Sequence, residues 1–334
     1  MFAPWLTVAY DDKVLNEDLD GAINYDEHVY HVPGEFARLV SPTPEASGNI
    51  GAPLTQALLE AKIFNLTVVS RNTSNATFPK GVIVHRSDMT DEDLLSILRG
   101  QDAIVCAVGP TGFDDQKRLI DLAIKADVKR FLPSEFSIHT SSRVVRDVMP
   151  LFNAKWSTIE YLRQKEKEGL SWTGLATGFL FDWGMKQGIF GFNLKDHTAT
   201  IWDEGDTQFS ATNLATACQA LVSILQNPED TANQYVHVAS FATSQNQILN
   251  ELKAAGMLDW SIISVTTEDQ IKTGREMFRT GNFMGMMLLV QAATMGNLAG
   301  LNSDYGKDEK LWNQQLGLPF EIVKQSVEGL VSSE

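Results

Sequence analysis

The chain has 334 residues, a hydrophobic fraction of 43% and a formal net charge of −15. This length suggests one large domain or two smaller ones, and the composition is that of a globular protein. The negative charge argues against a nucleic acid partner, because its phosphates would be repelled. Two cysteines, Cys106 and Cys218, are too few for a disulfide scaffold, and their apolar surroundings indicate core positions.

The N-terminus has no basic region and no obvious cleavage site of the kind that marks a secretory signal. The most apolar run, residues 283–295, is too short to span a bilayer. We therefore expect a cytoplasmic protein with neither a membrane nor a nucleic acid as partner.

Residues 1–45 form an atypical, acidic N-terminal segment that fits poorly with the regular pattern of the rest of the chain. A short apolar stretch at 35–40 is followed by two prolines, and Glu45 stands where a phosphate loop would have its first glycine. One explanation is a gene-model artefact. The other is a genuine extension that supplies a divergent first strand from residues 36–40.

Residues 46–71 predict a glycine turn, a helix and a buried strand. Gly48 and Gly51 are spaced as in the second half of a dinucleotide-binding loop, where backbone N–H groups meet a pyrophosphate. Ser70 and Arg71 follow the strand, and an arginine there suits the 2′-phosphate of NADP(H). Loop residues predicted to contact this cofactor are Ser47, Gly48, Asn49, Ile50 and Gly51.

Strands and helices then alternate as far as residue 178. Strands are predicted at 81–85, 103–108, 129–132 and 170–177, with helices at 91–98, 116–126 and 150–168 between them. Such alternation is typical of an α/β fold with a doubly wound parallel Rossmann sheet. We assign 46–178 to the dinucleotide-binding domain. Residues 179–334 form a smaller α+β substrate-binding region, partly interleaved with the sheet.

Several candidate site residues follow predicted strands, at the edge where open α/β sheets bind ligands. Asp88 is a candidate for the adenine or ribose, although it could equally be one acid on an acidic surface. Ser134 is a candidate next to the nicotinamide, or else a serine that caps the following turn. The other predicted cofactor contacts at strand ends are Val108, Gly109 and Pro133.

Two lysines compete for a catalytic role. Lys165 completes a Tyr-x-x-x-Lys pattern with Tyr161, as in ordinary short-chain dehydrogenases. At 100° per residue, however, Lys155 shares the apolar face of the predicted helix, whereas Tyr161 lies about 120° away. A desolvated lysine has a lowered pKa that suits proton transfer. We therefore predict Lys155 as the catalytic general acid/base.

An aromatic-rich segment follows residue 178 and lies just after a strand end. Its side chains could line a substrate pocket or belong to the core. The predicted substrate contacts are Phe136, Phe179, Phe181 and Trp183. The histidines at 139, 197 and 237 lack ligand spacing, so no metal site is predicted.

The motifs together resemble the NmrA-like, isoflavone-reductase-like branch of the atypical short-chain dehydrogenase/reductases. The matching pieces are ASGNIG (46–51), VVSR (68–71), SD (87–88), VKRFLPSEF (128–136), Lys155 and TGFLFDWG (177–184). The resemblance implies NADP(H) on the glycine loop and the Ser-Arg pair, a nicotinamide beside the Pro-Ser-Glu-Phe strand end, and a lysine as general acid/base. It implies an NADPH-dependent reductase of small aromatic secondary metabolites. The alternative is a non-catalytic dinucleotide-sensing regulatory protein.

Overall fold

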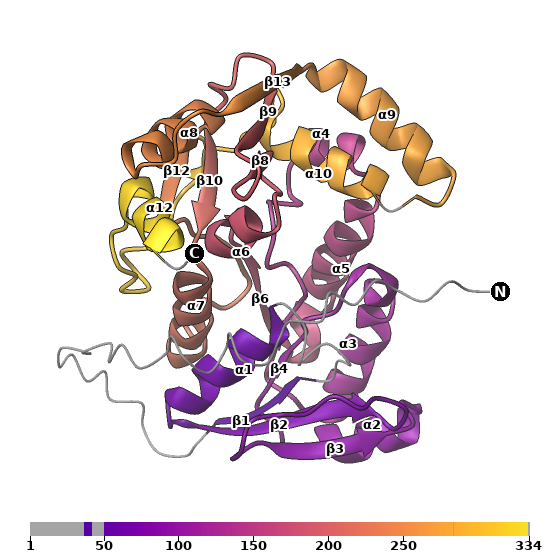
Figure 1. Ribbon diagram of the computed structural model, residues 1–334. Helices are drawn as coiled ribbons and strands as arrows, with labels where there is room; N and C mark the ends of the chain where they lie inside the picture. The colour runs from indigo at the N-terminus through magenta and orange to yellow at the C-terminus, as the bar shows by residue number, and fades with distance from the viewer. Residues whose placement is uncertain (1–36, 42–49, 283, 333–334) are drawn as a thin grey trace. The chain divides into compact units, whose positions relative to one another are not determined.

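Seven parallel strands form the main sheet of the computed structural model, which describes residues 37–41, 50–282 and 284–332 (Figure 1). The strands run in the order β11 (Gln234–His237), β6 (Ser171–Ala176), β5 (Arg130–Leu132), β4 (Ala103–Val105), β1 (Ala37–Ser41), β2 (Phe64–Arg71) and β3 (Ile83–Ser87). The chain moves outward from β1 to β3 and then returns to the other side of β1 with β4. This order confirms the predicted doubly wound sheet, and its switch point lies between β1 and β4.

The first strand comes from the segment that fitted poorly in the sequence. Ala37–Ser41 forms β1, which pairs in parallel with β2 on one side and β4 on the other. The Rossmann sheet therefore begins before residue 46, and the domain boundary placed there is wrong. These five residues occupy the place of the divergent first strand that the second explanation expects, whereas the gene-model explanation stays a hypothesis. The rest of segment 1–45 lies outside the described residues, as do the predicted cofactor residues Ser47, Gly48 and Asn49.

Helices cover both faces of the sheet. On one face α1 (Gly51–Glu60) contacts α7 (Leu214–Gln226), with Leu54, Leu58 and Leu221 in their shared core. The other face carries α2 (Asp91–Leu98), α3 (Gln116–Lys125) and α5 (Phe152–Lys165). Apolar residues at helical spacing produce these packed faces. Cys106 and Cys218 are both buried, as predicted for core residues.

Two small sheets and several helices make up the remainder. One sheet has the order β12 (Phe241–Thr243), β10 (Phe209–Thr212) and β7 (Phe179–Leu180), and the other β13 (Ser261–Val265), β9 (Thr198–Trp202) and β8 (Phe192–Asn193). The helices are α4 (Arg143–Val148), α6 (Phe181–Lys186), α8 (Gln245–Ala254), α9 (Thr267–Arg279), α10 (Met284–Met295), α11 (Tyr305–Asp308) and α12 (Val323–Ser332), with short 3-10 turns at Pro110–Gly112 and Glu166–Glu168. β11 and α7 return from this part of the chain to the main sheet.

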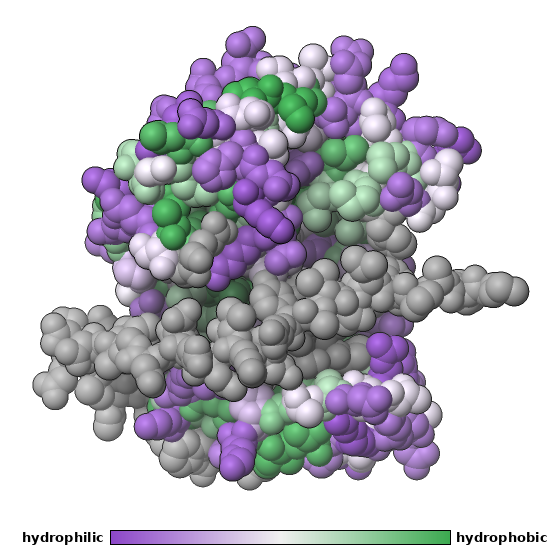
Figure 2. Space-filling model, in the orientation of Figure 1, coloured by the Kyte–Doolittle hydropathy of each residue, from purple (hydrophilic) through white to green (hydrophobic). Residues whose placement is uncertain are grey.

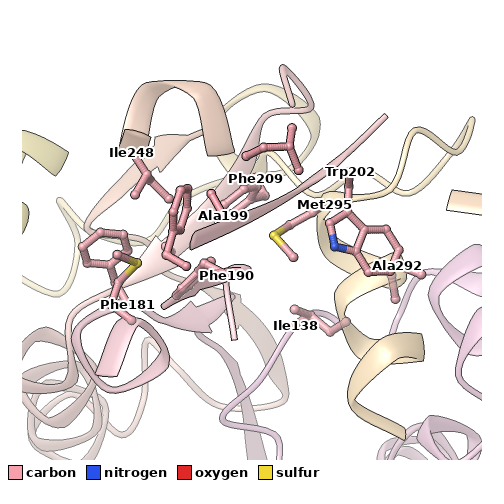
Figure 3. Close-up of a cluster of buried hydrophobic side chains, with 14 of the residues drawn as sticks. Ile138, Phe181, Phe190, Ala199, Trp202, Phe209, Ile248, Ala292 and Met295 are labelled. Carbon is pink, nitrogen blue, oxygen red and sulfur yellow. The ribbon is translucent and has the colours of Figure 1, made fainter. Parts of the chain in front are cut away.

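The second region has its own apolar core (Figure 3). Phe190 contacts both Phe181 and Phe209 there, and it stacks on Phe209 at a centroid distance of 5.6 Å. On the surface, hydrophilic residues predominate in the view of Figure 2 and the hydrophobic ones form small groups. In the part of the chain that the structure describes, no helix has the length and apolar character needed to cross a membrane.

Candidate active site

Lys155 lies on the buried face of α5, as the helical spacing predicts. Phe152, Ile159 and Leu162 share this face, and only 6% of Lys155 is exposed. Its Nζ donates hydrogen bonds to the carbonyl oxygen of Glu135 at 2.8 Å and to Ser137 Oγ at 3.0 Å. Both acceptors lie just after β5, so the lysine reaches back to the carboxyl end of the sheet.

Burial changes the protonation of this lysine. Desolvation lowers the pKa of Lys155 from 10.5 to about 8, and the nearby charge of Glu135 opposes that change. The rings of Phe113 and Phe152 lie 5.0 and 5.4 Å from Nζ and help to exclude water. A group with a pKa near 8 can both donate and accept a proton close to neutral pH.

Glu135 is a buried acid that the sequence analysis did not single out. Its Oε2 accepts hydrogen bonds from Tyr235 Oη at 2.6 Å and Thr140 Oγ1 at 2.7 Å, while Oε1 has no partner among the described residues. Burial raises the pKa of this carboxyl, and Lys155 counteracts the rise. Tyr235 stands 100 residues later in the chain, so local sequence could not have revealed the pair. An acid inside the apolar run FLPSEF was the available clue.

Ser134 joins the ends of two strands. Its Oγ donates to the carbonyl oxygen of Val108 at 2.8 Å, and its N–H donates to Gln116 Oε1 at 2.8 Å. The Pro133 carbonyl accepts from the N–H of Glu135 at 2.7 Å, which tightens the turn after β5. Gly109, next to Val108, leads into the 3-10 turn at Pro110–Gly112. The structure thus brings Val108, Gly109, Pro133 and Ser134 together, with Lys155 bonded to their neighbours Glu135 and Ser137.

The part of the site predicted to bind the phosphates of the cofactor, called the phosphate end below, consists of the start of α1 and the ends of β2 and β3. Gly51 is the buried first residue of α1, and in this described helix Ile50 provides no side-chain cap and the first turn has no acid. Ser70 is buried, and its Oγ accepts from Arg86 Nη1 at 3.0 Å. Arg71 is exposed beside it. The sequence analysis did not identify Arg86. Its position two residues before Asp88, at the end of the next strand, was the signal that could have indicated it.

Arg86 and Asp88 also have local structural roles. Arg86 donates to the carbonyl oxygens of Ser74 and Ala76 at 2.6 and 2.7 Å, which ties the loop after β2 to β3. Asp88 Oδ1 accepts from the N–H and the hydroxyl of Thr90, the residue that caps α2. These two bonds lower the pKa of Asp88. The capping explains Asp88 without a ligand, and its contact to the adenine or ribose stays a prediction.

The competing Tyr-x-x-x-Lys pattern faces a different environment. Tyr161 Oη donates to Asp121 Oδ1 at 2.6 Å. Lys165 Nζ lies 3.5 Å from the same carboxylate and 3.0 Å from Glu168. The contacts to Asp121 join α5 to α3, and the contact to Glu168 lies within the end of α5 and the 3-10 turn that follows it; none is at a strand end. The argument that Lys155, and not this pair, occupies the apolar face is confirmed.

The predicted substrate residues have unequal exposure. Phe181 is fully buried in the core of Figure 3, where it contacts Phe190 and Phe241, so it is a core residue and not a pocket wall. Phe136 is also buried, whereas Phe179 and Trp183 are half-buried. Trp183 Nε1 is a buried donor without a partner among the described residues.

The three histidines are not all scattered in space. The rings of His139 and His237 lie 5.7 Å apart, and Glu309 stands beside them. Burial lowers the pKa of both rings, that of His237 to about 3, so they are neutral near pH 7. His197 stands elsewhere and stacks on Trp260. The spacing of the histidines along the chain therefore did not reveal that His139 and His237 lie close together. They meet because β11 returns to the main sheet and brings His237 with it.

Comparisons with known proteins agree with the motifs. The sequence matches the NmrA-like family over residues 45–256. It is 32% identical over 289 residues to the oxidoreductase aprR of Aspergillus flavus, covering 86% of this chain and 96% of that protein. The solved structure of isoflavone reductase superposes with a TM-score of 0.69 at 21% sequence identity, and the match covers 90% of this chain and 99% of that structure. The binary complex of leucoanthocyanidin reductase with NADPH, from Vitis vinifera, superposes with a TM-score of 0.69 at 16% sequence identity. This match covers 89% of this chain and 99% of the reductase.

Proposed function

Because the chain belongs to the NmrA-like family, we propose that it is an NADPH-dependent reductase of small aromatic molecules. The named oxidoreductase among its relatives supports the reaction class, and the leucoanthocyanidin reductase complex, which contains NADPH, supports the cofactor. The observation that carries the proposal is Lys155, a buried lysine held at the carboxyl end of β5 with its pKa lowered to about 8.

The residues at the phosphate end fit NADPH. The start of α1 at Gly51 has neither an acid nor a side-chain cap in its described first turn, so its N–H groups suit a pyrophosphate. Arg71 is exposed at the end of β2 and would meet the 2′-phosphate, next to the buried hydroxyl of Ser70. Val108, Gly109 and Pro133 would border the nicotinamide end.

When bound, NADPH would supply the hydride, and the chain itself would supply the proton. The ammonium form of Lys155 has three N–H donors, and the Glu135 carbonyl and Ser137 Oγ accept from two of them. The third is the proton that Lys155 would give to the substrate. Glu135 would act through Lys155, because its negative charge favours the protonated form. Ser134 would hold the two strand ends together at this place.

The substrate would lie beside the aromatic side chains after β6. Phe179 and Trp183 are half-buried and can contact a planar ring, and the unpartnered Trp183 Nε1–H can donate to a substrate oxygen. Phe136 lies in the turn region after Glu135 and is the third candidate contact. We infer that the protein acts in the cytoplasm on small aromatic compounds.

The test combines cofactor binding with turnover. Calorimetry measures NADPH and NADH affinity, and a screen of aromatic ketones, enones and benzylic ethers follows the loss of reduced nicotinamide absorbance. We expect tighter binding of NADPH than of NADH, and turnover of at least one substrate class. Tight NADPH binding without any turnover would instead support the dinucleotide-sensing regulator. Absence of NADPH binding would refute both.

A further inference from the structure

Two histidines and a glutamate meet beside the edge strand β11, and the proposed reduction uses none of them. His139 comes from the segment after β5, His237 ends β11, and Glu309 directly follows α11. One potential ligand atom from each residue lies within 4.8 Å of the other two. Both histidines are buried, and the Glu309 side chain is 31% exposed. Three separate segments therefore bring two imidazoles and a carboxylate to one place.

The hydrogen bond of His139 determines which of its nitrogens is available. Its Nε2 lies 2.9 Å from the carbonyl oxygen of Leu301, which can only accept, so Nε2 carries the proton. In the neutral ring Nδ1 then has the lone pair. It lies 3.8 Å from Glu309 Oε1 and forms only a long contact, of 3.5 Å, with Ser141 Oγ. Histidines that bind metals usually donate their other N–H in this way to a carbonyl or carboxylate.

His237 has a buried polar atom without a partner. Its Nε2 is shielded from solvent and makes no hydrogen bond within the described part of the chain. The ring is surrounded by those of Tyr235, Tyr305 and His139, at centroid distances of 5.2, 5.0 and 5.7 Å. Buried polar atoms are paired in the great majority of cases, so an exception needs an explanation. A bound cation would supply one.

We propose that His139, His237 and Glu309 bind one Zn²⁺ ion. Two imidazole nitrogens and one carboxylate oxygen form a donor set that zinc accepts, with a fourth position left for water. Bonds of about 2.0–2.2 Å place tetrahedral ligand atoms ~3.4 Å apart. The ligand atoms here lie within 4.8 Å of one another, so they have to approach by up to about 1.4 Å. The partly exposed side chain of Glu309 can contribute to this movement, because it belongs to a loop and not to the sheet.

The ion would secure the segment around Glu309 to the edge of the main sheet. This segment already runs along β11, since Leu311 forms a bridge with His237 and the N–H of Trp312 donates to the His237 carbonyl at 2.9 Å. Tyr305, from the same segment, accepts from the N–H of His139 at 2.8 Å. Zinc would add a bond between side chains where the backbone contacts end.

Calorimetric titration of the chelator-treated full chain with Zn²⁺ tests the proposal, and Co²⁺ serves as a spectroscopic probe of tetrahedral coordination. We expect one ion per chain and a melting temperature that rises with zinc. Glu309→Gln and His237→Gln should each weaken binding by at least ~10- to 100-fold, the loss caused by removing even an outer hydrogen-bond partner of a ligand. The control is His85→Gln, an exposed histidine on β3 at the opposite edge of the sheet. It should bind zinc as the parent does.

Glu309→Gln keeps the test valid if His237→Gln fails to fold, because its side chain is partly exposed and the amide has almost the same shape. Its melting temperature in chelator should equal that of the parent. The proposal is overturned if the parent binds no zinc, or if one-to-one binding survives Glu309→Gln. The second result would place the ion on surface carboxylates of this acidic chain.

Discussion

Replacing Lys155 with methionine removes the proton donor and keeps a side chain of similar length. General acid–base catalysis typically contributes about 10²–10⁴-fold, so kcat should fall by that order. NADPH affinity should change little, because Lys155 bonds to Glu135 and Ser137 rather than to the predicted cofactor residues. In the parent enzyme, kcat should decrease as the pH rises through about 8, the pKa of Lys155, since the acid form is lost. The methionine variant should lack this decrease.

The same pKa predicts a change in stability with a definite sign. A fall from 10.5 to about 8 corresponds to about 3 kcal/mol, at roughly 1.4 kcal/mol per pKa unit. Because the folded pKa lies below the unfolded one, the unfolded chain binds more protons between pH 8 and 10.5. Below pH 8 the buried lysine therefore lowers the free energy of unfolding of the parent by the full ~3 kcal/mol. As the pH rises from 8 to 10.5, this loss of stability disappears. Lys155→Met should lack this gain.

Urea unfolding of both proteins between pH 7 and 10.5, with kcat measured over the same range, tests both statements. Relative to Lys155→Met, the free energy of unfolding of the parent should rise by about 3 kcal/mol from pH 8 to 10.5. A parallel pH dependence of the two proteins would refute the buried, depressed lysine. Loss of NADPH affinity as large as the loss of kcat would refute its role in proton transfer.

Three further substitutions test other parts of the site. Arg71→Ala should weaken NADPH binding about ten- to a hundredfold and leave NADH nearly unchanged, since a hydrogen bond to a charged group contributes ~1.5–3 kcal/mol; equal losses in calorimetry would argue against the 2′-phosphate contact. Tyr161→Phe should lower kcat less than about threefold, or under ~0.7 kcal/mol, because Tyr161 bonds to Asp121 at the α3–α5 contact; an inactive variant would mean that the ordinary short-chain mechanism operates. Phe181→Ala should destabilise the fold by about 3–5 kcal/mol in urea unfolding, because Phe181 is a fully buried core ring. Phe179→Ala should mainly raise KM. The reverse pattern would mean that Phe179 is the core residue and Phe181 the substrate contact.

Much of the architecture could be predicted because it depends on local periodicity. Alternating apolar strands and amphipathic helices predicted a parallel sheet, and the helix at Asp91–Leu98 has the predicted bounds. The face of Lys155 was also predictable, since 100° per residue places it with Phe152 and Ile159 whatever the tertiary structure. The first strand was harder to assign. Ala37–Ser41 is followed by prolines, and only its pairing with β2 and β4 shows that it belongs to the centre of the sheet.

The sequence by itself determined the order of elements, the strand ends that carry the candidate cofactor residues, and the buried face of α5. These features depend on neighbours a few residues apart. Tertiary structure alone decided which distant side chains meet: Glu135 with Tyr235, Ser70 with Arg86, and His139 with His237 and Glu309. It also placed Phe181 in the core and left Phe179 partly exposed, although the two are two residues apart. The reason is that contact and burial depend on how strands and loops pack together, which spacing along the chain does not encode.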